Sequence, residues 1–473
     1  MSDAPKTQVQ ALAEFAAACR DEGIPAAVAK DVSERILDVA GNCLAGRAEE
    51  TSETDPGNAV LRTVSTWGSG GAAEVLGTDV VLPAPNAALV NGTYAHALDF
   101  DDTHLPSVLH PSASVVPAAL AVAQEVGASG RDLLAAVAAG IEVCNRLGMA
   151  SYDKGLRNST FFERGQHATS ICGTLGAATA AALLYGLDAG GVADAVGIAA
   201  SMGSGVLEAN RTGGTVKRVH CGWAAHGGVA AAAFAAHGVT GPPTVIEGRF
   251  GFFQAWLSGV YDASALLDGL GERWETTRTV YKPYPTNHFT HPAIDCAIAL
   301  REQGLDPADV VAIEAGFPAP TLRTVAEPPE DKARPRSAYH AKFSGPFTVA
   351  TALLGGGGLG VYLDDFADGA HQDPARLDLA AKVTCFADER ASEIFPNAFA
   401  AVVRVTTRGG SVLEHRVDSS RGGPGHPLPA ADLRAKFLLN AARAVGEPAA
   451  EALAAAVTGL GDAPRVGPLT SGD

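Results

Sequence analysis

The sequence predicts a mainly α-helical protein that also contains a smaller α+β region, and three observations support this prediction. At 473 residues the chain exceeds the size at which one hydrophobic core keeps growing, so two domains are expected. Hydrophobic residues make up 47% of the chain and charged residues 18%, which is ample apolar surface for a large core. The hydrophobic pattern is helical nearly throughout from Val9 to about Ala236, and it changes near residue 280.

The first region is dominated by alanine-rich helical segments that are separated by Gly and Pro. In residues 31–44, apolar side chains recur at helical spacing from Val32 to Cys43. Asp31, followed by Glu34 three residues later, predicts the start of that helix. Helices so rich in Ala and Gly can approach closely, because little side-chain bulk separates them. We therefore expect a large bundle that forms a rigid wall for a site.

The second region combines strand and helix patterns, and its Gly-Gly pair at 409–410 predicts a β-hairpin. The predicted strands are 310–317, 382–386, 401–407 and 412–417. The predicted helices are 292–303, 346–354, 432–444 and 448–460. The predicted domains are a helical domain in 1–279, an α+β domain in 280–429 and a helical return to the first domain in 430–473.

Charge and cysteine content restrict the class of protein. The formal net charge of -17 argues against nucleic acid and anionic membranes as partners, but it leaves a small anionic substrate possible. The seven cysteines are scattered and contain no C-x-x-C pair, which fits a reducing compartment. The N-terminus lacks a secretory pattern, and apolar stretches such as 227–238 are far shorter than the ~20 residues of a membrane span. We expect a soluble cytoplasmic protein.

The segment 99–112, which reads DFDDTHLPSVLHPS, carries the strongest signal for chemistry. It lies between an apolar stretch and an alanine-rich helical stretch, so its carboxylates and imidazoles are expected where buried helices meet. In such surroundings their pKa values are shifted and their geometry is defined. Capping of the next helix explains one or two of these groups, but not the whole set.

Three interpretations of this segment remain open. Asp101 and Asp102 suggest the magnesium site of isoprenoid synthases, although no second acidic cluster follows. His104 and His110 suggest a transition-metal site, although their spacing matches no compact motif. Acid–base catalysis needs an imidazole with a near-neutral pKa and a group that orients it. His110 or His167, oriented by Asp99, would provide this third chemistry.

Two lysines complete the candidate site. Lys217 lies in a glycine-rich stretch, where an exposed loop lysine is the structural alternative. Lys282 lies in the sequence YKPYP at the predicted domain boundary, where clefts form, and prolines restrict its backbone. A lysine held there suits a carboxylate substrate. The glycine run 355–358 lacks the continuation of a phosphate loop and predicts a turn, and there is no G-x-S-x-G motif.

Several motifs together resemble the MmgE/PrpD family, whose activities include 2-methylcitrate dehydratase, cis-aconitate decarboxylase and iminodisuccinate epimerase. The matching motifs are LPAPNAALVNGT at 82–93, AHALDFDDTH at 95–104, HPS at 110–112, GTLGAA at 173–178, YKPYP at 281–285, HPAID at 291–295, AKFS at 341–344 and RGGPGHPL at 421–428. The resemblance implies an all-helical domain built from both chain ends, an α+β lid domain, a homodimer, and a cleft between the domains that uses no metal or organic cofactor.

The resemblance also implies the site residues. The catalytic set is Asp99, His110, His167, Lys217 and Lys282, and the substrate-binding set is Thr103, Tyr281 and His288, with Asn287 as the alternative to His288. The chain differs from 2-methylcitrate dehydratases at 107–113, where it reads SVLHPSA in place of a sequence like EWGHPSD. It carries Thr348 or Phe347 where the decarboxylase has a tyrosine that faces the substrate.

We therefore expect a cofactor-independent lyase or isomerase that moves a proton α to a carboxylate of a small di- or tricarboxylate, by dehydration or epimerisation. The lysines would neutralise the substrate carboxylate, and His110 and His167 would serve as base and acid. Asp99 would orient a histidine or act as the base. A decarboxylase of the cis-aconitate type and a non-catalytic carboxylate-binding protein are the alternatives.

Overall fold

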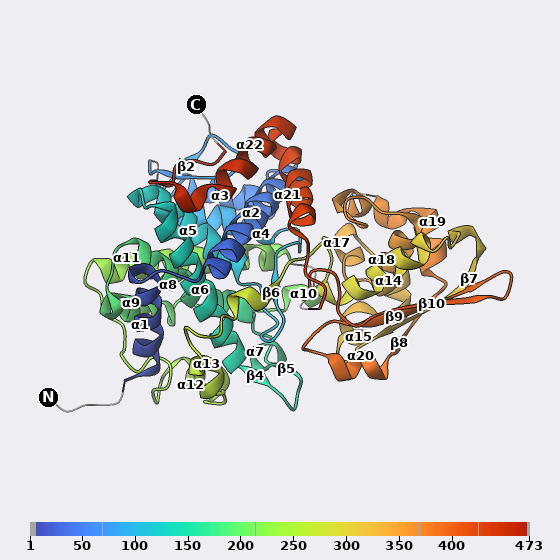
Figure 1. Ribbon diagram of the computed structural model, residues 1–473, viewed down its shortest axis with the longest axis horizontal. Helices are drawn as coiled ribbons and strands as arrows, with labels where there is room; N and C mark the ends of the chain where they lie inside the picture. Colours follow the sequence, from blue (N-terminus) through green and yellow to red (C-terminus); the bar gives the residue numbers. More distant parts are fainter. Residues whose placement is uncertain (1–5, 69, 213, 368, 424, 471–473) are drawn as a thin grey trace. The chain divides into compact units, whose positions relative to one another are not determined.

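The computed structural model describes residues 6–68, 70–212, 214–367, 369–423 and 425–470, and it divides into two compact units (Figure 1). Unit 1 contains residues 1–279 and 437–473, and unit 2 contains residues 280–436. The division at the C-terminal side falls inside one helix, α21 (Ala430–Val445). The predicted combination of a mainly helical fold and a smaller α+β part is confirmed.

Unit 1 is a bundle of α-helices with a few two-residue strands. Its helices are α1 (Gln8–Asp21), α2 (Ala26–Glu49), α3 (Pro56–Val64), α4 (Ala84–His96), α5 (Ser112–Val126), α6 (Gly130–Ala150), α7 (Thr160–Glu163), α8 (Ala168–Leu184), α9 (Ala189–Ala199), α10 (Ala209–Thr212), α11 (His220–Ala236), α12 (Phe252–Leu257), α13 (Ala263–Leu267) and α22 (Glu447–Thr458). Its short strands are β1 (Ala73–Glu74), β2 (Val81–Leu82), β3 (Thr103–His104), β4 (Tyr152–Asp153) and β5 (Asn158–Ser159), and β6 (Thr279–Val280) lies at the division.

The centre of unit 1 is formed by α4, α5, α6, α8 and α11, which pack against one another. Small residues allow this close packing. A Cβ atom added to Gly222 of α11 would lie 2.1 Å from the Leu89 carbonyl oxygen and 2.3 Å from Thr93 Oγ1, both on α4. On the other side of the same contact, a Cβ added to Gly92 would lie 2.8 Å from the Gly222 Cα. The two glycines therefore set the distance between α4 and α11.

The start of α2 differs from the prediction. The helix begins at Ala26, directly after Pro25, so Asp31 lies inside the helix and does not cap it. Its carboxylate instead accepts a hydrogen bond from Arg35 Nε, one turn later, at 2.7 Å. The sequence pattern missed the true start because the five residues before Asp31 are also compatible with helix.

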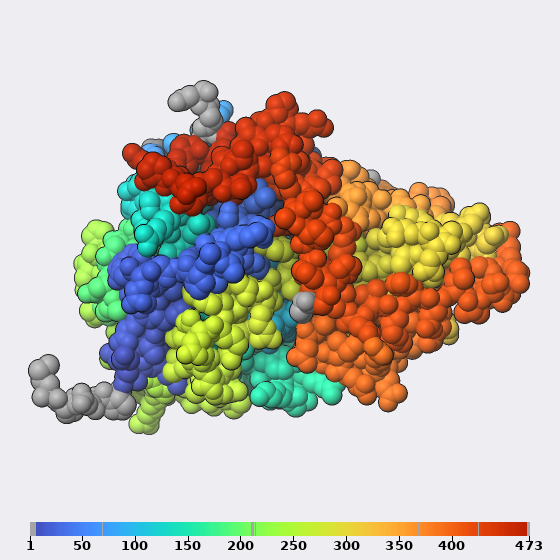
Figure 2. Space-filling view, viewed as in Figure 1, coloured from blue at the N-terminus to red at the C-terminus, as the bar shows by residue number. Residues whose placement is uncertain are grey.

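The C-terminal helix α22 packs on α2, which completes the bundle with both ends of the chain (Figure 2). Asn440 of α21 donates a hydrogen bond to Asn42 of α2 at 3.1 Å in the buried part of this contact. Among the described residues, α6 is long and apolar enough to cross a membrane by length and composition. However, 94% of its most apolar window is buried in the protein, as in a core helix.

Unit 2 is built around a four-stranded sheet with the order β10-β9-β7-β8. β7 runs parallel to β8, whereas β9 is antiparallel to both β7 and β10. The strands are β7 (Val310–Phe317), β8 (Val383–Ala387), β9 (Ala401–Thr407) and β10 (Val412–Val417). The predictions of these strands and of the hairpin are confirmed, with β8 shifted by one residue.

The helices of unit 2 are α14 (His291–Glu302), α15 (Leu322–Val325), α16 (Pro329–Ala333), α17 (Ala338–Ala341), α18 (Gly345–Leu354), α19 (Pro374–Ala380) and α20 (Glu389–Ile394). α14 packs against α18, β9 and β10, and this contact forms the core of the unit. The glycine run 355–358 begins with the left-handed residue that ends α18, at a φ of 97°, as the predicted turn requires.

We expect Gly222→Ala to destabilise the protein by about 1–3 kcal/mol, because the new methyl group overpacks the contact between α4 and α11. This sign is opposite to the usual effect of Gly→Ala inside a helix. Chemical denaturation followed by circular dichroism measures the change. Gly467→Ala is the control, since a Cβ there meets nothing within 4 Å. An unchanged midpoint for Gly222→Ala would contradict the packing described here.

Candidate active site

The segment 99–112 connects α4 to α5 and is mostly buried. Asp102 anchors it from inside. Its carboxylate accepts hydrogen bonds from Ser112 Oγ at 2.5 Å and from the Ser112 backbone N–H at 3.3 Å, at the start of α5. It also forms a buried ion pair with Arg35 of α2 at 2.9 Å. Asp102 is therefore a capping and anchoring residue, and the magnesium interpretation of Asp101 and Asp102 is not supported by this arrangement.

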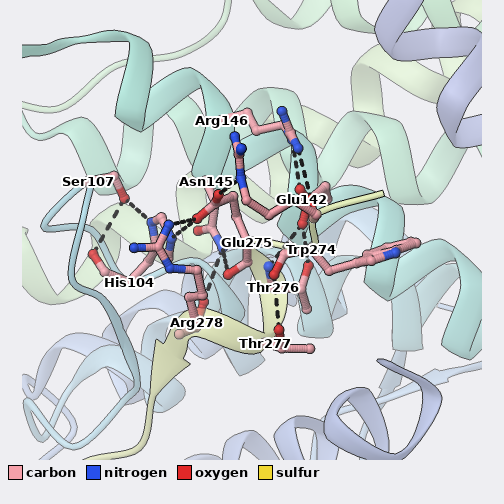
Figure 3. A network of polar contacts seen from close by, with 12 residues as sticks. His104, Ser107, Glu142, Asn145, Arg146, Trp274, Glu275, Thr276, Thr277 and Arg278 are labelled. Carbon is pink, nitrogen blue, oxygen red and sulfur yellow. Dashed lines mark hydrogen bonds and ion pairs between the residues drawn. The ribbon is translucent and has the colours of Figure 1, made fainter. Parts of the chain in front are cut away.

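His104 belongs to a second anchor (Figure 3). Its Nδ1 lies 2.6 Å from Ser107 Oγ and its Nε2 lies 3.3 Å from a carboxylate oxygen of Glu275. Burial lowers the pKa of His104, so the imidazole is neutral and both ring nitrogens have partners. Burial alone would raise the pKa of Glu275, but hydrogen bonds from His104 and Arg273 outweigh it, and the pKa falls to about 2. A metal site formed by His104 and His110 is therefore not supported.

Four imidazoles gather at helix ends in unit 1, and we call them the histidine cluster: His96, His110, His167 and His220. His96 is the last residue of α4, His110 precedes α5, His167 is the N-cap of α8 and His220 begins α11. The ring centroid of His96 lies 5.7 Å from that of His110 and 5.8 Å from that of His167. The centroids of His167 and His220 are 5.0 Å apart.

The proton on His110 is assigned by its partner. His110 Nδ1 lies 2.6 Å from the backbone oxygen of Asp102 and 3.2 Å from Thr103 Oγ1. A carbonyl oxygen only accepts hydrogen bonds, so Nδ1 carries the proton. In the neutral ring, Nε2 then carries the lone pair that can exchange a proton with a substrate. Thr103 and His110, two of the predicted residues, are thus brought together.

His167 and His220 share one proton between them. Their Nδ1 atoms are 2.9 Å apart, so one ring donates and the other accepts. Burial lowers both pKa values, a proton on His96 would lower them further, and the pKa of His220 falls to about 4. Both rings are therefore neutral near pH 7. Two imidazolium ions could not face each other through protonated Nδ1 atoms.

Lys217 lies in the 3-10 turn 215–219, directly before α11, and its side chain is half-buried. Three causes lower the pKa values of His167 and His220. Burial is the largest, a proton on His96 is the second, and the ammonium of Lys217 is the third. This cation thus acts electrostatically on two members of the histidine cluster. Asp99 is buried in the same segment, with a φ of 57°, a strained conformation for a residue with a side chain.

Sequence reasoning missed His96 and His220, and it weighed Asp101 only as a magnesium ligand. His96 Nδ1 lies 2.7 Å from a carboxylate oxygen of Asp101, and both side chains are buried. The signal for His96 is its place inside the motif AHALDFDDTH. His220 follows Lys217 by three residues at the start of an alanine-rich helix, and this position offers no comparable signal.

His96, Asp101 and Cys221 offer the one group of possible metal-ligand atoms found among the described residues, and these atoms lie within 4.8 Å of one another. The His96–Asp101 hydrogen bond already uses two of these side chains. Burial raises the pKa of the Cys221 thiol well above its usual value, so the thiol is protonated. In this structure the group is thus a hydrogen-bonded pair beside a protonated thiol.

The remaining predicted residues lie in unit 2. Lys282 and Tyr281 are buried in the segment after β6. His288 is buried against the rings of Phe399 and His291, at centroid distances of 5.0 Å and 4.6 Å.

Three neighbouring side chains of unit 2 serve local structure. The Asn287 side chain accepts a hydrogen bond from the Phe289 backbone N–H at 3.1 Å, so it caps the turn His288–Thr290. Thr348 Oγ1 donates to the Ser344 carbonyl at 2.8 Å, and Phe347 packs in the core of unit 2, so α18 uses both side chains internally.

The neutral His220 makes stability depend on pH. Its folded pKa of about 4 lies below the usual 6.5, so the unfolded chain binds the proton first. The contribution of His220 is complete above about pH 6.5 and is lost as the pH falls from there towards 4. We expect His220→Gln to show a smaller loss of unfolding free energy than the wild type over this range, measured by urea denaturation. Exposed His237→Gln should keep the wild-type slope, and an unchanged slope in His220→Gln would refute the assignment.

Comparisons with known proteins identify the family. The family models named MmgE/PrpD N-terminal domain and MmgE/PrpD C-terminal domain match residues 10–263 and 284–462. Cis-aconitate decarboxylase of Homo sapiens is 30% identical over 406 residues, which cover 83% of this chain and 80% of that protein. Cis-aconitate decarboxylase of Aspergillus terreus is 26% identical over 418 residues, which cover 84% and 83%. With both family domains matched along most of its length, the chain belongs to the MmgE/PrpD family and is an enzyme.

Proposed function

We propose that this enzyme is a cofactor-independent lyase or isomerase that moves a proton at the carbon next to a carboxylate of a small di- or tricarboxylate. The observation that carries the proposal is the histidine cluster, with two rings neutral near pH 7 and Lys217 acting on them. The named activity of the relatives, which is exerted on the tricarboxylate cis-aconitate, supports this substrate class.

The chemical difficulty is charge. Removing a proton beside a carboxylate, or losing CO₂ there, places a second negative charge next to the first. A preorganised cation reduces this penalty, and one such donor commonly contributes about 3 kcal/mol to the transition state. Lys217 is the first candidate for this role in unit 1, and Lys282 is the candidate from unit 2. A lysine suits it as a compact charge with several donors.

Proton transfer is assigned to the cluster. Neutral imidazoles near pH 7 accept protons and return them, and positioned acid–base groups contribute about 10²- to 10⁴-fold in rate. His110 has its Nδ1 proton committed to the Asp102 carbonyl, so Nε2 is the nitrogen of the neutral ring that can accept a proton. His167 shares a proton with His220 and can pass it on. Asp99 would orient an imidazole or act as a base, and Thr103, Tyr281 and His288 would contact the substrate.

The reaction outcome depends on how the carbanion forms and what happens to it next. Loss of hydroxide as water is dehydration, loss of CO₂ before protonation is decarboxylation, and return of a proton to the opposite face is epimerisation. Thr348 and Phe347 are both used inside unit 2, so neither supplies the tyrosine of the decarboxylase. We therefore place dehydration and epimerisation first, with decarboxylation as the alternative that the relatives' names favour.

The test combines substrates and variants. Proton NMR in deuterated water follows cis-aconitate, citrate, 2-methylcitrate and iminodisuccinate for deuterium uptake, water addition or loss of CO₂. We expect Lys217→Ala and Lys282→Ala each to lower kcat/KM by about 10²-fold, which corresponds to the loss of one charged donor. Lys154→Ala, at a side chain that is 89% exposed, is the control. Unchanged turnover in both active-site variants, or no reaction with any acid, would reject the proposal.

We further propose a cytoplasmic homodimer. The seven cysteines are all free thiols, which supports a reducing compartment. Trp67 and Trp223, both large apolar side chains, are 54% and 42% exposed on unit 1, and exposed aromatic groups of this kind are typical of interaction faces. Sedimentation velocity at micromolar concentration should give about twice the monomer mass of 48.1 kDa, and Trp223→Glu should lower it. A wild-type monomer would contradict this proposal.

A further inference from the structure

We propose that His96, oriented by Asp101, is the general base of this enzyme and takes the proton at its Nε2 atom. The inference deepens the proposed function and rests on it. It goes beyond the set of residues expected from the sequence, because that set includes neither His96 as a catalytic residue nor Asp101 as its partner.

Asp101 fixes the orientation of the His96 ring. His96 Nδ1 and a carboxylate oxygen of Asp101 are 2.7 Å apart, and their side chains are 2% and 0% exposed. A carboxylate accepts hydrogen bonds and does not donate them, so His96 Nδ1 carries the proton. A buried carboxylate that accepts this hydrogen bond holds the ring in one tautomer and orientation, and it stabilises the imidazolium that forms later.

The other nitrogen of the His96 ring is Nε2. In the neutral form of the ring, with the proton on Nδ1, the Nε2 atom carries a lone pair. This atom is buried and has no hydrogen-bond partner among the described residues. A buried acceptor that is left unsatisfied costs about 1–3 kcal/mol. A ligand that brings an acidic hydrogen to Nε2 removes this cost, so the orientation of the ring and the unused nitrogen both favour a base.

Two other imidazoles lie next to His96. The His96 ring lies between His110 and His167, with ring centroids 5.7 Å and 5.8 Å away. His110 is half-buried, whereas His167 is buried and shares a proton with His220. A proton accepted by His96 therefore has His110 as a neighbouring imidazole to which it can pass, whereas the lowered pKa of His167 disfavours protonation of that ring.

In the proposed step, each bond that breaks is matched by a bond that forms. The C–H bond next to the substrate carboxylate breaks, its electron pair enters the enediolate of that carboxylate, and a new N–H bond forms at His96 Nε2. The proton then goes to the leaving hydroxyl, which departs as water, or returns to carbon in an epimerisation. In a decarboxylation no C–H bond breaks: the electron pair of the carbon–carbon bond forms the carbanion as CO₂ leaves, and a proton from solvent, delivered through His96 Nε2, goes to carbon.

The test uses His96→Gln, Asp101→Asn and the double variant, with turnover of cis-aconitate and citrate measured at saturating concentration. We expect His96→Gln to lower kcat by about 10²- to 10⁴-fold, as for a positioned base. Asp101→Asn should lower kcat less, because the ring remains but its tautomer is no longer held. The double variant should be no slower than His96→Gln alone, since two residues that act as one unit are not additive. Exposed His237→Gln is the matched control and should keep wild-type kcat.

A positive readout separates catalysis from folding. Imidazole added to His96→Ala should restore part of the lost kcat in proportion to its concentration, whereas a purely structural role predicts no rescue. Wild-type kcat in His96→Gln, or a double variant that loses the product of the two single effects, would overturn the proposal. Loss of wild-type activity with a chelator would also overturn it, because His96, Asp101 and Cys221 would then hold a metal. If the wild type itself transforms neither acid nor any other acid of the panel, the proposed function fails first.

Discussion

Four helix ends meet in unit 1, and three of the four imidazoles they carry are buried. The small residues of α4 and α11 permit this meeting, because Gly92 and Gly222 bring the two backbones into direct contact. Imidazolium ions so close together in a low-dielectric interior would repel strongly. Burial and mutual repulsion therefore keep His167 and His220 neutral near pH 7.

Neutrality is useful only if each ring holds its proton on a defined nitrogen. His96 Nδ1 donates a hydrogen bond to Asp101, His110 Nδ1 donates one to a backbone carbonyl, and His167 and His220 share one proton between their Nδ1 atoms. In His96 and His110 this leaves Nε2 as the nitrogen that can react. The hydrogen bonds that satisfy the Nδ1 atoms thus determine which ring nitrogen can react.

Fixed charges elsewhere in the segment 99–112 maintain this geometry. Asp102 pairs with Arg35 at one side of the segment, and Glu275 pairs with Arg273 and Arg278 beside His104 at the other. These carboxylates form ion pairs with arginines, and Asp102 also accepts a hydrogen bond from the start of α5, so their role is structural. The acidic residues of one short motif are therefore divided between anchoring, for Asp102, and the orientation of an imidazole, for Asp101.

The sequence predicts the fold better than it predicts the site. Strands β7, β9 and β10 match their predicted bounds because β-branched runs and a Gly-Gly turn delimit them. The predicted start of α2 was wrong because alanine-rich residues precede Asp31 without interruption. Motifs pointed to His110, His167 and Lys217. The His96–Asp101 pair crosses a helix end, and the His167–His220 pair joins residues 53 positions apart, so neither follows from periodicity.

The protonation states of the four imidazoles are the central claim, and ¹⁵N NMR of the histidine ring nitrogens as a function of pH measures them directly. The account predicts that His167 and His220 are neutral at pH 7 with one proton between their Nδ1 atoms, and that His220 becomes charged only near pH 4. It also predicts that His96 Nδ1 carries the proton of the hydrogen bond to Asp101. An imidazolium at His167 or His220 at pH 7, or a proton on His96 Nε2 in place of Nδ1, would contradict it.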